Sequence, residues 1–132
     1  MNILVIDSMG GGIGKAVIEQ VRSSFDNAII TAVGTNSIAT TAMLKAGAHN
    51  AATGENAVIY NAAKADYIIG VIGIIAANSM HGEVSPKMAQ AVSSSPAHKI
   101  LIPIDKCSIT VAGVAPTSIQ TYISDIVKKL GG

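Results

Sequence analysis

Short runs rich in Ile and Val alternate along this chain with longer stretches whose apolar residues recur at helical spacing. The expected strands cover residues 2–6, 28–33, 50–53, 66–72 and 99–104. The expected helices begin after a glycine-rich segment at residues 10–14 and near residues 37, 55, 85 and 116. This alternation favours a parallel sheet covered on both faces. We therefore predict a single domain over residues 1–132, a three-layer α/β sandwich with a mostly parallel, doubly wound sheet that is Rossmann-like or flavodoxin-like.

Two segments interrupt the alternation. Residues 73–83, "GIIAANSMHGE", are apolar without a clear period, so they fit either a buried strand or a helical turn. Residues 108–113, "SITVAG", follow the fifth expected strand too closely for a crossover helix to fit between. We expect them to form an antiparallel last strand or a bent continuation of the fifth strand.

The chain is poor in charged side chains, which make up 13% of its residues against a usual share of roughly 25%. A surface with so few charges often buries part of itself against a second subunit, so we expect a homo-oligomer, most simply a two-fold dimer. The formal net charge is +1, and the basic residues are scattered apart from Lys128 and Lys129. This distribution argues against nucleic-acid binding, which needs clustered Lys and Arg.

Cysteine and histidine usage argues against a disulfide and against a metal site. Cys107 is the only cysteine, which excludes an internal disulfide and a cysteine-based metal cage; its thiol is either reactive or a buried apolar group. The three histidines are far apart in the sequence, so no metal is predicted. We read no signal peptide, and the longest apolar run has 11 residues, so we expect a cytoplasmic protein that does not enter a membrane.

Polar residues gather where the predicted strands end. In a parallel doubly wound sheet, the ligand site lies beyond the carboxyl ends of the strands. The residues expected there are Asp7, Ser8, Thr35, Asn36, Glu55, Asn56, residues 78–83, Asp105 and Lys106. Loops are commonly polar, but half of the eight acidic residues fall on this one edge. That concentration predicts a polar site at this edge.

The segment "SMGGGIGKA", residues 8–16, admits two interpretations. Consecutive glycines let backbone N–H groups approach an anion above the positive end of the following helix, which favours phosphate binding. Alternatively, the glycines only form a tight turn that lets the helix pack close to the sheet. Three glycines in a row exceed what a turn needs, so we favour an anion site. Its residues would be Asp7, Ser8, Gly10, Gly11, Gly12, Gly14 and Lys15.

Known nucleotide-binding motifs fit this segment poorly. Counted from Gly10, the third glycine of the dinucleotide fingerprint falls on Lys15. The second expected strand ends in "VGTN", without the acidic residue that would hold a ribose hydroxyl. Ala16 stands where a P-loop has Ser or Thr for magnesium, so magnesium-dependent ATP hydrolysis is not expected. The cofactor is left unassigned, with a nucleotide or a dinucleotide both open.

Two further segments carry candidate residues. Thr35 and Asn36 open the second helix beside the glycine segment, where they either donate to a ligand or only cap the helix. Asn78, His81 and Glu83 follow an apolar run, and His81 is suited to act as general acid or base with Glu83 as its partner. Alternatively, the apolar run forms a subunit interface and these polar residues are its rim.

The motifs also form a set that extends over nearly the whole chain. The segments "VIDSMGGGIGKA", "GTNSIATTAMLKAGA", "TGENAVIYNAAKADYIIG", "GIIAANSMHGEVSPKMA" and "KILIPIDKC" together resemble a small bacterial family of unknown function. The resemblance implies a Rossmann-like fold and supplies no established activity, substrate or catalytic residue. Ser8 stands where the family pattern usually has Gly before the glycine run.

The sequence therefore predicts a protein that binds a nucleotide or another phosphorylated small molecule at the strand ends. The residues expected to form the pocket are Gly10 to Gly14, Lys15, Thr35 and Asn36, completed by Asp7, Asn78 and Glu83. Whether the protein is a sensor or an enzyme stays open; in an enzyme, Asp7 or Glu83 would be the general base. The alternative is a non-catalytic assembly or regulatory subunit, in which residues 72–80 mediate oligomerisation and the glycine loop is structural.

Overall fold

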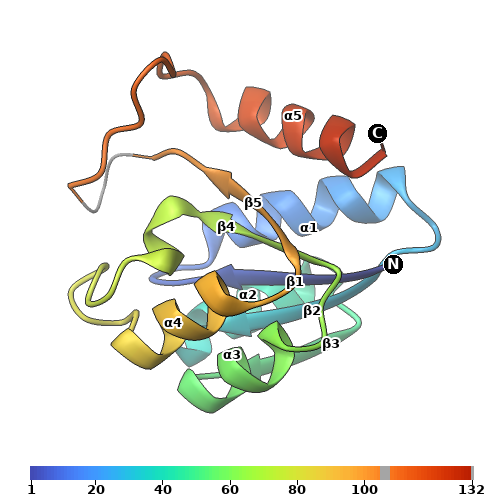
Figure 1. The fold of residues 1–132 in the computed structure, drawn as a ribbon. Coiled ribbons are helices and arrows are strands. Elements are labelled where there is room, and N and C mark those ends of the chain that lie inside the picture. Colours follow the sequence, from blue (N-terminus) through green and yellow to red (C-terminus); the bar gives the residue numbers. More distant parts are fainter. Residues whose placement is uncertain (105–107, 132) are drawn as a thin grey trace.

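The computed structural model describes residues 1–104 and 108–131, and these residues form a five-stranded sheet (Figure 1). The strands are β1 (Asn2–Asp7), β2 (Ile29–Gly34), β3 (Asn50–Thr53), β4 (Tyr67–Val71) and β5 (His98–Ile102). Their spatial order is β3-β2-β1-β4-β5, and every pairing is parallel. This is the strand order of the doubly wound Rossmann fold, so the predicted α/β class and parallel sheet are confirmed.

Helices cover both faces of the sheet. They are α1 (Gly12–Ser24), α2 (Ser37–Lys45), α3 (Glu55–Ala62), the short 3-10 helix η1 (Ile72–Ile75), α4 (Pro86–Ser94) and α5 (Ile119–Gly131). Helix α1 packs against α2 and α5, whereas α3 packs against α4. Figure 1 shows α1 and α5 on one side of the sheet and α3 and α4 on the other.

The hydrophobic pattern explains why these elements form where they do. Strand β1 lies in the middle of the sheet, and every residue after its first is buried, as a strand covered on both faces requires. Helix α1 buries Val17, Ile18 and Val21, which recur at helical spacing on one face. Helix α4 begins as the sequence indicates: the Ser85 side chain accepts a hydrogen bond from the Met88 amide, and Pro86 occupies the first turn.

The expected antiparallel last strand is wrong, because all described strands are parallel and residues 108–113 form none. Pro103 ends β5 because it has no N–H for a strand ladder, and the Ile104 amide turns back to the Ile102 carbonyl at 2.9 Å. The backbone then takes positive φ at Ser108 (59°) and Gly113 (81°), which is incompatible with a strand. Three residues named in the sequence predictions lie outside the described residues: Asp105, Lys106 and Cys107.

The ambiguous segment at 73–83 forms one 3-10 turn followed by further turns, so the helical-turn reading is confirmed over the buried strand. Ile74 is 2% exposed and belongs to the core, while Ile75 is 37% exposed. Beyond η1 the chain passes across the carboxyl ends of the strands before α4 begins. This segment therefore contributes to the site rather than to the sheet.

The order of the strands creates a crevice between β1 and β4. After β1 the chain proceeds outward to β2 and β3, whereas β4 and β5 extend the sheet in the opposite direction. The connections that leave β1 and β4 therefore diverge to opposite faces. In doubly wound sheets, ligands bind at this switch point, outside the carboxyl ends of the strands.

Candidate functional site

The loop between β1 and α1 is a tight turn with one amide turned inward. The Gly11 amide donates to the Ser8 carbonyl at 3.1 Å, and Gly11 takes a left-handed conformation with φ 73°. Met9 also has positive φ, 54°. The Lys15 amide then donates to the Gly11 carbonyl at 2.9 Å, which starts the helical hydrogen-bond pattern. The turn thus brings the first amides of α1 to the carboxyl end of β1.

Two of the four glycines are required by packing. A Cβ atom on Gly11 would lie 2.8 Å from the Ala39 Cα atom at the start of α2, in addition to the positive φ. A Cβ atom on Gly14 would lie 2.5 Å from the Met43 Sδ atom and 3.0 Å from an Asp7 carboxylate oxygen. These glycines therefore let α1 approach α2 and β1, as the turn interpretation proposes.

The other two glycines have no such explanation. A Cβ atom on Gly10 or Gly12 would meet nothing within 4 Å, and neither residue has a positive φ. Both residues are exposed. Within the part of the chain that the structure describes, their amides have no protein acceptor in hydrogen-bonding range. Packing thus accounts for Gly11 and Gly14 and leaves Gly10 and Gly12 facing open space.

A buried carboxylate caps the inner side of the same turn. Asp7 is only 7% exposed, and its carboxylate accepts hydrogen bonds from the Gly14 amide at 2.6 Å and the Ser8 amide at 2.8 Å. Burial raises the pKa of the Asp7 carboxyl above its usual range, and the amide hydrogen bonds offset this only in part. Asp7 therefore holds a proton more readily than an exposed aspartate.

A pocket of about 470 Å³ opens beside this turn, at the crevice between β1 and β4. Its polar side is the turn itself, from Asp7 to Gly12. Its apolar side comes from distant parts of the chain: Ile13, Ala16, Val71, Met80, Ile104 and Ile119. The pocket thus joins backbone donors at one end to an apolar surface at the other.

Glu83 connects the far loop to the start of α2. The Thr35 hydroxyl donates to Glu83 Oε1 at 2.5 Å, and the Asn36 side-chain amide donates to the same oxygen at 2.8 Å. These two hydrogen bonds, Thr35 first, hold the pKa of the Glu83 carboxyl below its usual range. Asn36 also caps α2, since its side-chain oxygen accepts from the Ala39 amide at 2.9 Å. The Thr35 amide donates to the Asp7 carbonyl at 3.0 Å, which ties the ends of β1 and β2 together.

The loop that carries Glu83 has an unusual backbone. Met80, His81 and Gly82 are three consecutive residues with positive φ, of 56°, 56° and 87°. Asn78 also has positive φ, and its amide donates to the Val84 carbonyl at 2.7 Å, which closes the loop at its base. This path turns Met80 into the pocket while Glu83 reaches α2.

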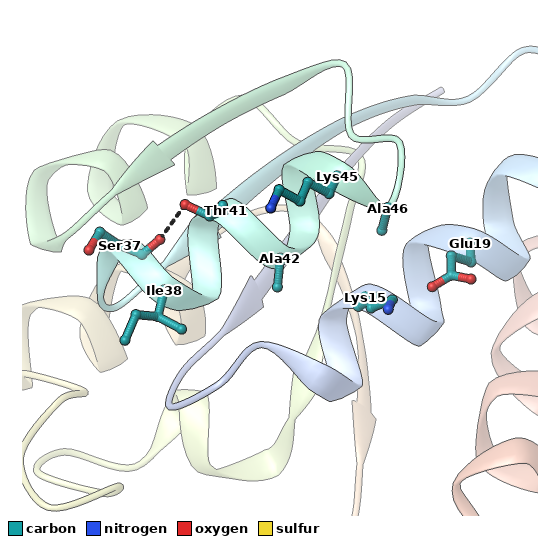
Figure 2. A pocket seen from close by; sticks show the side chains of 8 residues that line it. All are labelled: Lys15, Glu19, Ser37, Ile38, Thr41, Ala42, Lys45 and Ala46. Atoms are coloured by element: carbon teal, nitrogen blue, oxygen red, sulfur yellow. Dashed lines mark hydrogen bonds between the residues drawn. The ribbon is translucent and has the colours of Figure 1, made fainter.

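Some predicted residues lie apart from this pocket. The side chain of Lys15 lines a separate groove of about 720 Å³ between α1 and α2, with Glu19, Ile38 and Lys45 (Figure 2). Asn78 and His81 are exposed. Five of the predicted residues line the pocket: Asp7, Ser8, Gly10, Gly11 and Gly12. Thr35, Asn36 and Glu83 form a hydrogen-bonded cluster beside it at the end of β2, and Gly14 lies under the turn with its amide on the Asp7 carboxylate.

Sequence reasoning missed the apolar wall of the pocket. Val71 is the last residue of β4, so its position at a strand end was a usable signal. Ile104 and Ile119 flank the connection between β5 and α5 and have no local pattern that separates them from core residues. Among the described residues, no three His, Cys, Asp or Glu side chains gather as a metal site would require. The described helices include none that is long and apolar enough to cross a membrane.

The strand order, the crevice at the switch point and the glycine turn define a Rossmann-like α/β protein. Within that class, the chain belongs to the family described as Domain of unknown function (DUF3842), whose profile matches residues 2–131. No curated protein sequence matches the chain. Among solved structures, it is similar to a dodecameric FMN-dependent UbiX-like decarboxylase from Escherichia coli O157:H7, at 14% identity and a TM-score of 0.47. That similarity covers 100% of this chain and 96% of the other.

Proposed function

We propose that this protein binds a nucleotide or another phosphorylated small molecule in the pocket beside the β1–α1 turn. The observation that carries this proposal is the pair Gly10 and Gly12. Neither glycine is needed for packing or for a positive φ, and both line the pocket. A glycine that has no structural role at the rim of a pocket is best explained by a ligand that approaches its backbone.

The chemistry of the turn suits a phosphate. The amides of Gly10 and Gly12 are available donors, and the positive end of the α1 dipole lies at the same place. The buried Asp7 carboxylate occupies the inner amides of the turn, so a phosphate would bind on its outer, exposed side.

The apolar side of the pocket suits a ring. Val71, Met80, Ile104 and Ile119 offer a surface against which a base or another flat group would pack. A volume of about 470 Å³ lies within the usual range for small-molecule sites. A nucleotide or dinucleotide joins both requirements in one molecule. Lys15 is not part of this proposal, because its side chain lines the groove between α1 and α2.

Asp7 is the group best suited to move a proton if the protein is an enzyme. Asp7 lines the pocket, and the raised pKa of its carboxyl lies closer to neutral pH, as general acid–base catalysis favours. Glu83, whose pKa is lowered and whose Oε1 atom accepts two hydrogen bonds, is a weaker base.

The assembly interpretation is less well supported. It assigns oligomerisation to residues 72–80, but Ile74 is 2% exposed and packs into the core. A more exposed apolar side chain is found on α2, where Ile38 is 70% exposed in the groove beside α1 (Figure 2), against 37% for Ile75. We therefore propose a homo-oligomer as an accompaniment to ligand binding and not as an alternative to it, with a dimer as its simplest form.

A thermal-shift screen of the purified protein against NAD, NADP, ATP, GTP, FMN, FAD, CoA and inorganic phosphate tests the proposal, because a ligand of the native state must raise its stability. We expect at least one nucleotide to raise the melting temperature. Gly12→Ala should lower the affinity for that nucleotide by about tenfold or more. The unliganded protein should stay folded, because the new methyl group meets no protein atom.

Two matched glycine variants serve as controls. Gly131→Ala adds a methyl group at the end of α5, in ordinary contact with Phe25, and should change neither binding nor folding. Gly11→Ala should destabilise the protein, because its Cβ atom would collide with the α2 backbone. No response to any of the screened nucleotides, to CoA or to phosphate at millimolar concentration, or unchanged affinity in Gly12→Ala, would contradict the proposal.

A further inference from the structure

The end of β2 lacks an acidic residue of its own. In doubly wound folds that bind dinucleotides, a carboxylate near the end of the second strand accepts hydrogen bonds from the ribose hydroxyls. Here β2 ends at Gly34 and continues with Thr35 and Asn36, neither of which carries a charge. Read by sequence position alone, the chain has no group for this role.

The structure brings a carboxylate to that place from another part of the chain. Glu83 lies 48 residues beyond Thr35, yet both Thr35 and Asn36 donate to its Oε1 atom. The side chain is therefore held at the end of β2 by the two residues that follow the strand. Two side-chain hydrogen bonds hold the Glu83 carboxylate in this position. In the usual dinucleotide-binding fold, the carboxylate belongs to a residue near the end of the second strand itself.

The carboxylate also borders the glycine turn. Thr35, whose hydroxyl holds Glu83, donates its amide to the carbonyl of Asp7, the residue that opens the turn, at 3.0 Å, and the Met9 amide helps to lower the pKa of the Glu83 carboxyl. Gly10 follows Met9, about 3.8 Å further along the backbone. A ribosyl phosphate has its diol and its phosphate on the same sugar, so it can reach Glu83 and the Gly10 amide together.

The carboxylate has capacity left for a ligand. Both side-chain hydrogen bonds from the described residues end on Oε1, so the Oε2 atom retains lone pairs for hydroxyl donors. Glu83 is partly exposed, so a ligand can reach it. The lowered pKa keeps the carboxyl ionised at neutral pH, which makes it a strong acceptor.

We propose that Glu83, held at the end of β2 beside the pocket, binds the diol of the ligand, and that the ligand is a ribonucleotide with free 2′- and 3′-hydroxyls. This inference rests on the proposed function and narrows it to one class of ligand. A 2′-deoxynucleotide loses one of the two donors. The 2′-phosphate of NADP would lie beside the negatively charged Glu83 carboxylate and be repelled by it, so the protein should bind NADP more weakly than NAD.

The test compares matched pairs of ligands on the intact protein. Isothermal titration measures the affinities of ADP, GDP, CDP and UDP, of their 2′-deoxy counterparts, and of NAD and NADP. For the nucleotides that bind, we expect the ribose form to bind about tenfold more tightly than the deoxy form, the effect of one hydrogen bond to a charged group. Where NAD binds, NADP should bind more weakly still.

Glu83→Gln tests the residue. Glutamine retains an oxygen that accepts from Thr35 and Asn36, so the loop stays in place while the charge is lost. We expect the affinity for the ribonucleotide to fall by about tenfold and the affinity for the deoxynucleotide to stay unchanged. Asp26→Asn is the control, because it removes a charge from an exposed residue at the opposite edge of the sheet from the pocket. It should change the affinity for neither nucleotide. Circular dichroism confirms that each variant is folded.

Each outcome decides between the two proposals. Equal binding of ribose and deoxyribose forms would overturn the diol inference and leave phosphate binding standing. Equal weakening of both forms by Glu83→Gln would also overturn it, because a purely structural contact affects both ligands alike. Binding of none of these nucleotides would overturn the diol inference, and the thermal-shift screen, which also contains FMN, CoA and inorganic phosphate, would then decide the proposed function separately. If Glu83→Gln does not fold, the paired affinities of the unmodified protein still decide the diol question.

Discussion

At the scale of single residues, the most consequential group is the carboxylate at the end of β1. Asp7 is 7% exposed and accepts two amide hydrogen bonds from the turn that follows it. Its charge opposes the charge of any phosphate nearby, but it also neutralises part of the α1 dipole when the pocket is empty. The protonation state of Asp7 is therefore linked both to folding and to ligand binding.

This linkage predicts a pH dependence of stability with a defined sign. Because the folded-state pKa of Asp7 is raised, its contribution to stability is fully present below the unfolded value of 3.8 and is lost as the pH rises through the folded value. Asp7→Asn cannot titrate. The free energy of unfolding of the wild type relative to Asp7→Asn should therefore fall as the pH rises from 3.8, as measured by urea denaturation.

Glu83 supplies the control for this measurement, because its pKa is shifted in the opposite direction. Its contribution is present above the unfolded value of 4.5 and is lost as the pH falls through the lowered folded value. The free energy of unfolding of the wild type relative to Glu83→Gln should therefore increase as the pH rises from the lowered folded-state pKa towards 4.5. A slope of the same sign for both variants would contradict the assignment of the two environments.

Individual residues also mark the limit of prediction from sequence. The position of Asp7 at the end of a strand was readable from the pattern that precedes it. The contact between Glu83 and Thr35 was not, because it joins residues 48 apart through a loop without regular structure. Lys15 was misleading because its side chain lies about 200° around the helix from Ile13 and about 100° from Ala16, so it faces α2 while Ile13 and Ala16 line the pocket.

At the scale of elements, the strands and helices follow their hydrophobic periods closely, and the departures occur where those periods stop. Helix α2 ends at Lys45, and Gly47 follows with φ 116°, as its position in the sequence indicates. Residues 108–113 alternate in hydrophobicity as a strand does, but Val111 is 36% exposed and pairs with no strand among the described residues. Local pattern cannot report whether a partner strand is present.

The loop before α4 stores strain that a substitution can release. His81 is exposed, with φ 56°, and a left-handed residue other than Gly costs about 1 kcal/mol or more. His81→Gly should therefore stabilise the protein by about 0.5 kcal/mol in urea denaturation, because the released strain of about 1–2 kcal/mol exceeds the entropic cost of glycine of about 0.5–1 kcal/mol.

Ala77→Gly is the matched control in the same segment. Ala77 is exposed and has no positive φ, so the change brings only the entropic cost of glycine. It should destabilise the protein by about 0.5–1 kcal/mol. Destabilisation by both substitutions would show that the left-handed backbone carries no strain.

At the scale of the whole molecule, low charge and exposed apolar residues predict association. Charged residues make up 13% of the chain, and Ile38 projects from α2 with 70% exposure. We expect sedimentation equilibrium to give a mass at least twice the 13.4 kDa of one chain. Ile38→Glu should lower that mass, because a charge would be buried at the interface.

Tyr60→Glu tests whether the effect belongs to the α1–α2 face. Tyr60 is 58% exposed on α3, in the other helical layer, and its replacement should leave the mass unchanged. A mass of one chain at all concentrations would contradict the prediction of an oligomer. A larger effect of Tyr60→Glu than of Ile38→Glu would place the interface on the opposite layer.

Two residues that line the pocket lie at the two ends of the connection between β5 and α5. Ile104 stands before that connection and Ile119 after it, and the described residues 108–118 form neither helix nor strand. Since no sheet pairing passes through these residues, insertions or deletions there leave the strand register intact. The architecture thus separates evolvability from foldability. Substitutions, insertions or deletions in this connection can change which ligand the pocket prefers, while the glycine turn and the sheet keep their structure.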